Sequence, residues 1–421
     1  MSDWHTLKLE DCADILDHLR IPINEEERKK RPGQTPYYGA NGIQGTIDGW
    51  IFNEPLILMA EDGGYFDEFE TRPIAYKIIG KSWVNNHAHV IRPNETTDFN
   101  YLFYSLEHKN ILPYIKGGTR AKLNQKELRA IEIYLPFEKQ AQTAISKILD
   151  GIDQTIEKTE ALIHKYQQIK AGLMHDLFTR GVTADGKLRP PREQAPELYK
   201  ETSIGWIPKA WRVMPLNQLA TYQHGRPFPS TDYSNEGVLL LRPGNLHING
   251  FVSFDEAHTT RIPEKWLIKC PAYALQHGDI LMNLTAQSLE DQFLGRVCLN
   301  TEKEPVLLNQ RIAKFKGIAI DHYFLYWLLK SHQFREQIDH TTQGTKVQHL
   351  YNSDLNRVLL GVPKDKEEQL RIADRLKICV EAIQKNIEIF HKLKKQKSGL
   401  MEDLLTGKVQ VKTNQEEPCH V

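Results

Sequence analysis

The chain has 421 residues, and its 54 Lys and Arg residues balance 54 Asp and Glu residues to a formal net charge of zero. At about 150 residues per domain this length suggests two to four folding units, and a hydrophobic content of 40% excludes an intrinsically disordered chain. The charge balance excludes binding of polyanions through a global basic field, so any contact with nucleic acid must be local.

The five cysteines are scattered without the spacing of a zinc site, which is typical of a reducing compartment. The N-terminus has no basic and apolar leader, and no run approaches 18 uncharged apolar residues. We therefore expect a cytoplasmic, soluble protein without a bound metal.

Residues 1–135 show short apolar runs punctuated by glycine turns. The runs at 55–59 and 74–79 favour strands, and the run at 101–106 favours a helix. We expect this segment to form a first α+β domain.

A long helix is predicted over residues 136–180, because apolar side chains recur there at alternating steps of four and three. This spacing is typical of a coiled-coil seam. The predicted helix-pairing residues of the segment are Ile145, Leu149, Ile152, Ile156, Ile163 and Leu173.

Proline and glycine interrupt any period over residues 181–205, which predicts a linker. Residues 206–362 then repeat the features of the first domain, with a strand-like run at 278–282 and a helical run at 323–329. We expect a second α+β domain.

Residues 363–408 repeat the first long helix, and residues 409–421 form a tail. Lys170–Thr179 (KAGLMHDLFT) matches Lys397–Thr406 (KSGLMEDLLT) at seven of ten positions, and the same offset of 227 aligns about fifty residues. The predicted helix-pairing residues of this second copy are Ile372, Leu376, Ile383, Phe390, Leu393 and Leu400.

Both seams are broken at equivalent positions, Thr159 with Asn386 and Lys170 with Lys397, and polar layers of this kind fix the register of coiled coils. Two copies of one register favour mutual pairing over an ordinary amphipathic helix on a core. The predicted fold is α+β: two α+β target-recognition domains separated by two long helices, each roughly 60 Å long, that pair as an antiparallel coiled coil with pseudo-two-fold symmetry.

Such a frame suits duplex DNA, which has two-fold axes of the same kind. Two unlike domains would recognise two unlike half-sites at a separation that the helices set.

This order of parts resembles the specificity subunit of Type I restriction-modification enzymes over essentially the whole chain. The resemblance is carried by Tyr37–Gly45 (YYGANGIQG), by the two GLMxDL(F/L)T helix ends, and by Ser203–Pro208 (SIGWIP) followed by Trp211. It implies a non-catalytic subunit that recognises an asymmetric bipartite DNA target. It further implies binding to two methyltransferase subunits and to restriction or translocase subunits. S-adenosylmethionine, ATP and magnesium would be bound by those partners, which would methylate adenine and cleave DNA.

The chain lacks the motifs of such partner enzymes. No phosphate-binding Gly-x-x-x-x-Gly-Lys-Ser/Thr loop occurs, and no Asn-Pro-Pro-Tyr or Asp-Pro-Pro-Tyr adenine pocket. His87 and His89 could share one strand face as metal ligands, but a polar strand explains them better. We predict no catalytic residue.

Two segments of the first domain are candidate DNA contacts. Arg28, Lys29, Lys30 and Arg31 form the densest basic cluster and could meet phosphates, although a solvated loop next to acidic residues 25–27 fits equally well. Tyr38 and Asn41 offer an aromatic plane and an amide among glycines, with a tight turn that packs the tyrosines as the alternative.

Other candidates divide into repeated and unrepeated positions. Arg120 and Lys122 in the first half align with Lys346 and Gln348 in the second, so they cannot specify two different sequences. Phosphate positioning or packing of the domain against the helix fits them better. Sequence readout must come from residues that differ between the halves. The candidates in the second domain are Arg226, Arg242, Asn245, His247 and Gln287.

Two other functions remain open. The chain could be the recognition subunit of a related system whose partner combines methyltransferase and nuclease, which only neighbouring genes would distinguish. It could also be a coiled-coil adaptor that joins two ligand-binding domains without DNA.

Overall fold

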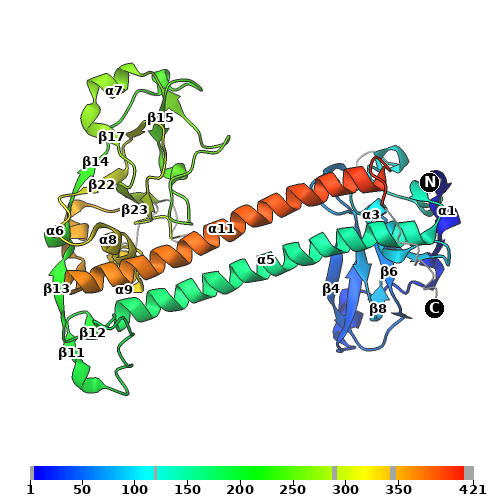
Figure 1. Ribbon diagram of the computed structural model, residues 1–421, viewed down its shortest axis with the longest axis horizontal. Helices are drawn as coiled ribbons and strands as arrows, with labels where there is room; N and C mark the ends of the chain where they lie inside the picture. The colour runs from blue at the N-terminus through cyan, green and yellow to red at the C-terminus, as the bar shows by residue number, and fades with distance from the viewer. Residues whose placement is uncertain (1–3, 118–120, 287–291, 342–347, 412–421) are drawn as a thin grey trace, which may run out of the picture. The chain divides into compact units, whose positions relative to one another are not determined.

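The computed structural model describes residues 4–117, 121–286, 292–341 and 348–411. The chain divides into two compact units: a first unit of Met1–Leu162 with Asn386–Val421, and a second unit of Ile163–Lys385. The long helices α5 (Lys139–Thr179) and α11 (Lys366–Leu405) each contribute one part to each unit (Figure 1).

Within its described residues, the first unit has two four-stranded sheets and one two-stranded sheet. The orders are β2-β9-β6-β7, which is antiparallel throughout, β4-β3-β8-β5, which contains the parallel pair β3-β8, and β1-β10. The strands are β1 (Trp4–Lys8), β2 (Ala13–Ile15), β3 (Thr35–Gly39), β4 (Gly42–Ile47), β5 (Phe52–Asn53), β6 (Leu56–Ala60), β7 (Ala75–Ile78), β8 (Lys81–Val84), β9 (Ala88–Pro93) and β10 (Glu132–Pro136).

Short helices cover these sheets. They are α1 (Leu9–Cys12), α2 (Glu25–Lys29), α3 (Phe99–Glu107) and α4 (Gln125–Arg129). The α3 helix begins at the N-cap Asp98, whose side chain accepts a hydrogen bond from Tyr101 N, and its apolar face is buried in the core that includes Ile145 and Leu149 of α5.

The second unit repeats this plan with its own sheets. Their orders are β14-β22-β18-β20 and β16-β15-β21-β17, with the pairs β13-β24, β11-β12 and β19-β23 beside them. The strands are β11 (Tyr199–Thr202), β12 (Gly205–Pro208), β13 (Trp211–Pro215), β14 (Thr221–His224), β15 (Val238–Leu241), β16 (Arg261–Ile262), β17 (Ala274–Leu275), β18 (Ile280–Asn283), β19 (Thr285–Ala286), β20 (Val297–Leu299), β21 (Val306–Leu308), β22 (Ile312–Lys316), β23 (Gln348–His349) and β24 (Leu359–Pro363). Its helices are α6 (Leu216–Leu219), α7 (Lys265–Lys269), α8 (His322–Leu328), α9 (His332–Thr341) and α10 (Asn352–Arg357).

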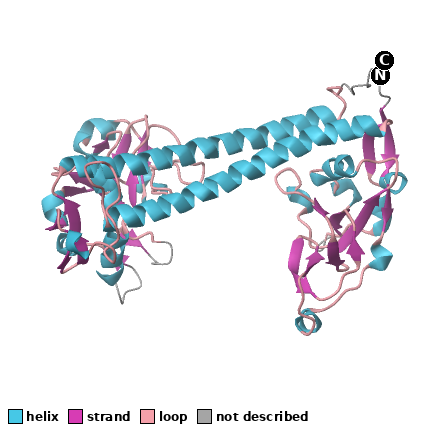
Figure 2. Ribbon diagram, turned by 60° about the horizontal axis from the view of Figure 1, so that its bottom comes forward, coloured by secondary structure: helices cyan, strands magenta, loops and turns pink. Residues whose placement is uncertain are grey.

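Each long helix begins after the same strand pair. In the first unit β1 pairs with β10 so that Trp4 lies opposite Pro136, and in the second β13 pairs with β24 so that Trp211 lies opposite Pro363. The helices start a few residues beyond these prolines, later than the sequence pattern indicated, because the prolines still belong to strands. Both units mix helices and sheets (Figure 2), which confirms the predicted α+β fold.

The two long helices pair antiparallel, as predicted. In the first unit Leu149 of α5 shares a core with Leu400 and Leu404 of α11, while Lys397 of α11 reaches Asp153 of α5, 2.8 Å away. In the second unit Leu177 shares a core with Ile372, and Cys379 lies 3.8 Å from Tyr166 O. Residue numbers thus rise along one helix as they fall along the other.

Every predicted helix-pairing residue is buried or half-buried. Ile145, Leu149, Ile163, Ile372, Leu376 and Ile383 are buried, and Ile152, Ile156, Leu173, Phe390, Leu393 and Leu400 are half-buried. The polar position Thr159 is buried as well, and its hydroxyl donates to Thr155 O of its own helix at 2.7 Å.

The predicted linker carries more structure than its composition indicated. The hairpin β11-β12 ends it, and the buried side chain of Arg189 pairs with Glu368 of α11, with Nη1 2.5 Å from Oε1 and Nη2 2.9 Å from Oε2. Glu368 also accepts from the indole Nε1 of Trp211 at 2.9 Å. The segment is therefore bound into the second unit at the start of α11.

Candidate nucleic-acid interface

The YYGANGIQG segment forms the hairpin β3-β4. Tyr37 is buried, and its hydroxyl donates to Ile23 O at 2.9 Å and accepts from Ile23 N at 3.1 Å. Tyr38 is half-buried, and burial raises the pKa of its phenol. The tyrosines therefore pack against the rest of the domain, which is the alternative that the sequence left open for this segment.

One side of this hairpin borders a hollow of about 450 Å³. Asn41 is exposed at its edge and donates from Nδ2 to Gly63 O at 2.9 Å, and the guanidinium of Arg72 lies 3.3 Å from the centre of the Tyr65 ring. The hollow thus combines aromatic planes with a cation, a combination suited to bases and phosphates.

The four cations of the basic cluster, two at the end of α2 and two just after it, lie in four different environments. Arg28 is half-buried over the Tyr37 ring at 4.6 Å, and Lys29 pairs with Glu25 at 2.8 Å. Lys30 is exposed, whereas Arg31 lies over the Trp83 ring at 4.9 Å and donates to Asp48 O at 3.2 Å. The four cations are therefore adjacent in sequence but do not form one continuous basic surface.

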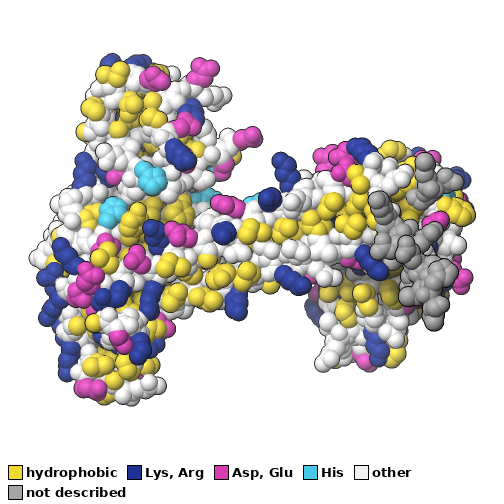
Figure 3. Space-filling view, in the orientation of Figure 1, with side chains coloured by type: hydrophobic (Ala, Val, Ile, Leu, Met, Phe, Trp, Pro, Cys, Tyr) yellow, Lys and Arg dark blue, Asp and Glu magenta, His cyan; other side chains and the backbone are white. Residues whose placement is uncertain are grey.

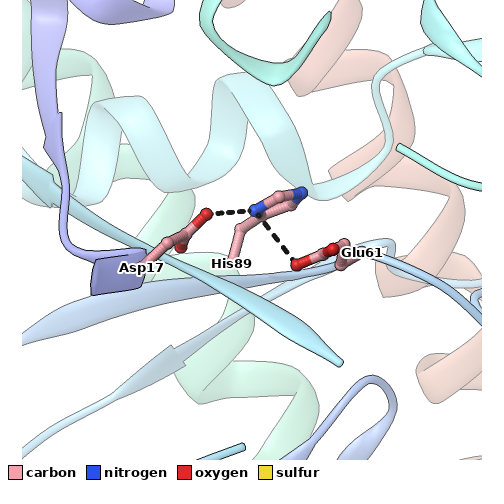
Figure 4. A group of neighbouring side chains, drawn as sticks. All are labelled: Asp17, Glu61 and His89. Atoms are coloured by element: carbon pink, nitrogen blue, oxygen red, sulfur yellow. Dashed lines mark hydrogen bonds and ion pairs between the residues drawn. The ribbon is translucent and has the colours of Figure 1, made fainter. Parts of the chain in front are cut away.

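Lys122 pairs with Glu61 at the edge of an ionic network. Figure 4 shows the centre of this network, which consists of Asp17, Glu61 and His89. His89 Nδ1 lies 2.6 Å from Asp17 Oδ2 and 4.0 Å from Glu61 Oε2. Glu61 also pairs with Arg20 at 2.7 Å and with Lys122 at 3.0 Å. Burial acts to raise the pKa of Asp17, but hydrogen bonding to His89, the charges of His89 and Arg20, and a bond from Val90 N lower it overall.

Asp17, Glu61 and His89 are the one group of potential metal ligands in the described part of the chain. A metal does not fit them well, because Arg20 and Lys122 already neutralise the carboxylates and His89 Nε2 faces Leu123 O at 2.8 Å. The network instead fixes the segment around Lys122 to the sheet.

Two of the candidates in the second unit are occupied by internal contacts. The Arg226 guanidinium lies between the rings of Phe228 and Trp266, at 5.3 and 5.4 Å. Asn245 is buried, accepts from Arg242 N at 2.8 Å and donates to Ser253 O and His258 O at 3.1 and 2.9 Å. Asn245 would have to break these bonds to reach a base.

The remaining candidates differ in exposure. Arg242 and His247 are exposed on loops, and Arg242 Nη1 donates to Thr260 Oγ1 at 3.1 Å. Gln348 is buried in β23, which pairs with β19. Arg120, Gln287 and Lys346 lie outside the described residues.

Sequence reasoning missed two hollows of about 580 Å³ each. In the second unit one is lined by exposed His224, His349, Tyr351 and Arg311, whose φ of 71° is unusual for a residue other than glycine. In the first unit the other is lined by Arg28, Gln44 and Asn85. For the latter, the basic cluster predicted Arg28, but nothing predicted that Gln44 and Asn85 lie beside it, since contacts between distant loops leave no periodic pattern.

The comparisons with known proteins decide the family. The model of the Type I restriction modification DNA specificity domain matches residues 1–168 and 208–394. The chain belongs to this family. The MjaVIII specificity subunit of Methanocaldococcus jannaschii is 28% identical over 424 residues, which cover 97% of this chain and 94% of the relative. The MjaX specificity subunit, from the same organism, is 27% identical over 98% of this chain and 95% of its own length.

Solved structures agree on the fold. The specificity subunit from M. genitalium superposes with a TM-score of 0.61 at 13% identity over 96% of both chains. A chain from a structure that describes complex assembly and conformational transition of the Type I system reaches 0.51 at 14% identity, over 97% of this chain and 99% of the other. Within the described residues, no helix is long and apolar enough to cross a membrane.

A specificity subunit supplies DNA recognition, and catalysis is carried out by its partner subunits. The two α+β units of this chain are therefore its target-recognition parts, and the other subunits of the restriction-modification system and DNA are its partners.

Proposed function

We propose that this specificity subunit selects an asymmetric, bipartite DNA sequence, with one half-site read by each α+β unit. The observation that carries the proposal is the duplication itself. The two units share the strand pair that starts each long helix, yet the side chains lining their hollows differ, with Arg28 and Gln44 in one and Arg311 and His224 in the other.

The paired helices would bind two methyltransferase subunits at equivalent surfaces. Hydrophobic side chains are exposed along the helices in Figure 3. Leu162 on α5 and Ile389 on α11 are 227 residues apart, the offset of the repeat, and their exposed fractions are 38% and 39%. Equivalent apolar positions that remain exposed favour docking of two copies of one partner.

The partners would supply the chemistry. S-adenosylmethionine would be bound by the methyltransferase subunits, which must take an adenine out of the base stack to methylate it. ATP and magnesium would be bound by restriction or translocase subunits.

The test is to produce the full chain with the methyltransferase encoded beside it and to map modified adenines in the host genome. Methylation at one split motif, lost when the gene for this chain is deleted, is the expected result. Exchange of residues 1–116 for the corresponding part of another specificity subunit should change one half-site and leave the other. A stable complex that methylates without any sequence preference would overturn the proposal.

A further inference from the structure

The hollow between α2 and the hairpin β3-β4 has the chemistry of a base-reading site. It measures about 580 Å³ and brings Arg28 of α2, Gln44 of β4 and Asn85 after β8 to one surface. These three residues are far apart in sequence and lie in the first unit.

The fold holds the Arg28 side chain in place without using the hydrogen-bond donors of its guanidinium. Its guanidinium stacks over the Tyr37 ring at 4.6 Å, and Tyr37 is held by both of its bonds to Ile23. In the described part of the chain, no hydrogen bond or salt bridge is found between the Arg28 side chain and another residue, although its charge helps to lower the pKa of nearby Glu25. A rigid guanidinium with free N–H donors is suited to a planar acceptor.

Gln44, which also lines the hollow, is held by Asn85. Its Oε1 accepts from Asn85 Nδ2 at 3.1 Å, and Asn85 is buried and accepts from His87 N at 2.8 Å. Among the described residues, no acceptor is bonded to Gln44 Nε2, so its donors are available. Gln44 itself is exposed, so Asn85 positions a side chain that can reach a ligand.

Two glycines of the hairpin border these side chains. A Cβ on Gly39 would collide with the Gln44 side chain, so glycine at this position leaves the space in which Gln44 lies. A Cβ on Gly45 would lie at an ordinary contact distance of 3.4 Å from Arg28 Nε, and it is the φ of +146° that favours glycine there.

The charges at the rim of the hollow favour a base over a phosphate as the group that binds there. Glu25 and Glu27 lie on it, and Lys29 neutralises only Glu25. A phosphate would meet a carboxylate there, whereas the edge of a base carries neutral acceptors. Arginine donating to O6 and N7 of guanine is the commonest specific contact in the major groove.

We propose that Arg28 reads a guanine in the half-site of the first unit and that Gln44, positioned by Asn85, reads the neighbouring base pair. This inference rests on the proposed function and assigns residues to it.

The test uses the complex of the full chain with its methyltransferase and a duplex library randomised over both half-sites. Arg28→Lys keeps the charge but removes the planar fork, and should lower the preference for guanine at one position of one half-site by about 10- to 100-fold. The other half-site should not change. Lys126→Met, which removes an exposed charge on α4 of the same unit, away from the hollow, should keep every base preference.

Gln44→Glu keeps the inference testable if Arg28→Lys disturbs the fold. It replaces the Nε2 donors by an acceptor, so the preferred base at the neighbouring position should change toward one that offers a donor there, such as cytosine N4. Unchanged preferences in both variants, or an equal loss of binding for all sequences, would overturn the inference while the wild-type half-sites still support the proposed function. A wild-type complex without sequence preference would overturn both.

Discussion

At the scale of single residues, the two lysines at equivalent positions of the repeat have pKa values that are shifted in opposite directions. Lys397 is paired with Glu107 at 2.9 Å and Asp153 at 2.8 Å, and despite burial these carboxylates raise its pKa. Its equivalent Lys170 lies 5.7 Å from the centre of the Trp327 ring, and burial lowers its pKa.

This contrast predicts unequal effects of one substitution. Lys397→Met should lower the free energy of unfolding by on the order of 3 kcal/mol, because it leaves two carboxylates without their shared cation. Lys170→Met removes a half-buried charge that forms no ion pair within the described residues, so the substitution should cost nothing or stabilise. Denaturant titration of both variants measures the difference, and equal losses would contradict the assignment.

Lys330 provides a pH test. Burial chiefly lowers its pKa to about 8 from 10.5, with smaller contributions from Lys170 and Arg296, opposed by Cys298. The unfolded chain then binds more protons between these pH values, so this lysine makes stability rise with pH by roughly 3 kcal/mol across the window. The Nζ group also donates to Val297 O at 3.3 Å and lies over the Tyr326 ring.

Lys330→Met should remove that component. The stability of the variant relative to the wild type is expected to fall by about 3 kcal/mol as the pH rises from 7 to 10.5. Lys303→Met, at an exposed position of the same unit, serves as the control and should show no such trend. Parallel curves for Lys330→Met and the wild type would show that Lys330 keeps an ordinary pKa.

At the scale of elements, the repeat predicted which residues are equivalent but not what they contact. Gln142 and Gln369 align in sequence, and each bridges its domain to its long helix. Gln142 accepts from Asp98 N at 2.8 Å and donates to Pro136 O at 2.9 Å, while Gln369 makes the same bonds to Asp321 N and Pro363 O, both at 2.9 Å. The seam residues were predictable because the apolar positions of a heptad repeat are the ones that become buried between paired helices.

The contacts of side chains between distant segments were not predictable in this way. Glu107 ends α3, and Lys330 follows α8 close to the corresponding place. The equivalent ends of these two helices therefore carry opposite charges, which the repeat of the long helices did not predict. Arg28 and Gln44 meet only because two loops approach each other. Of the residues predicted to bind DNA, Asn245 and Arg226 were chosen for their type, which does not reveal whether the fold itself uses their donors.

The glutamine bridge can be tested on one helix. Gln142→Leu should lower the free energy of unfolding by at least about 2 kcal/mol, because a buried N–H and a carbonyl both lose their partner. Gln154→Leu, at an exposed position of α5, is the matched control and should have little effect. Similar stabilities for the two variants would mean that water replaces the bridge.

At the scale of the whole molecule, each unit is completed by a helix segment from elsewhere in the chain. The core around Ile145 and Leu149 includes Leu404, which comes about 250 residues later, and the core around Ile372 includes Leu177. Neither half of the sequence therefore contains a complete unit. The paired helices are continuous through both units, which makes their length a candidate for setting the distance between half-sites.

If the helices set this distance, lengthening them should lengthen the spacer of the DNA target. Insertion of one heptad after Leu162 and one after Lys385 keeps the seam in register and lengthens both helices by roughly 10 Å, or about three base pairs. The spacer of the methylated motif should grow by that number while both half-sites stay the same. A heptad in α5 alone is the control, since it puts the two seams out of step and should abolish methylation. Methylation at the original spacing by the doubly extended chain would show that the helices do not set the spacer length. A longer spacer with unchanged half-sites would show that base recognition and spacer length are determined by different parts of the chain.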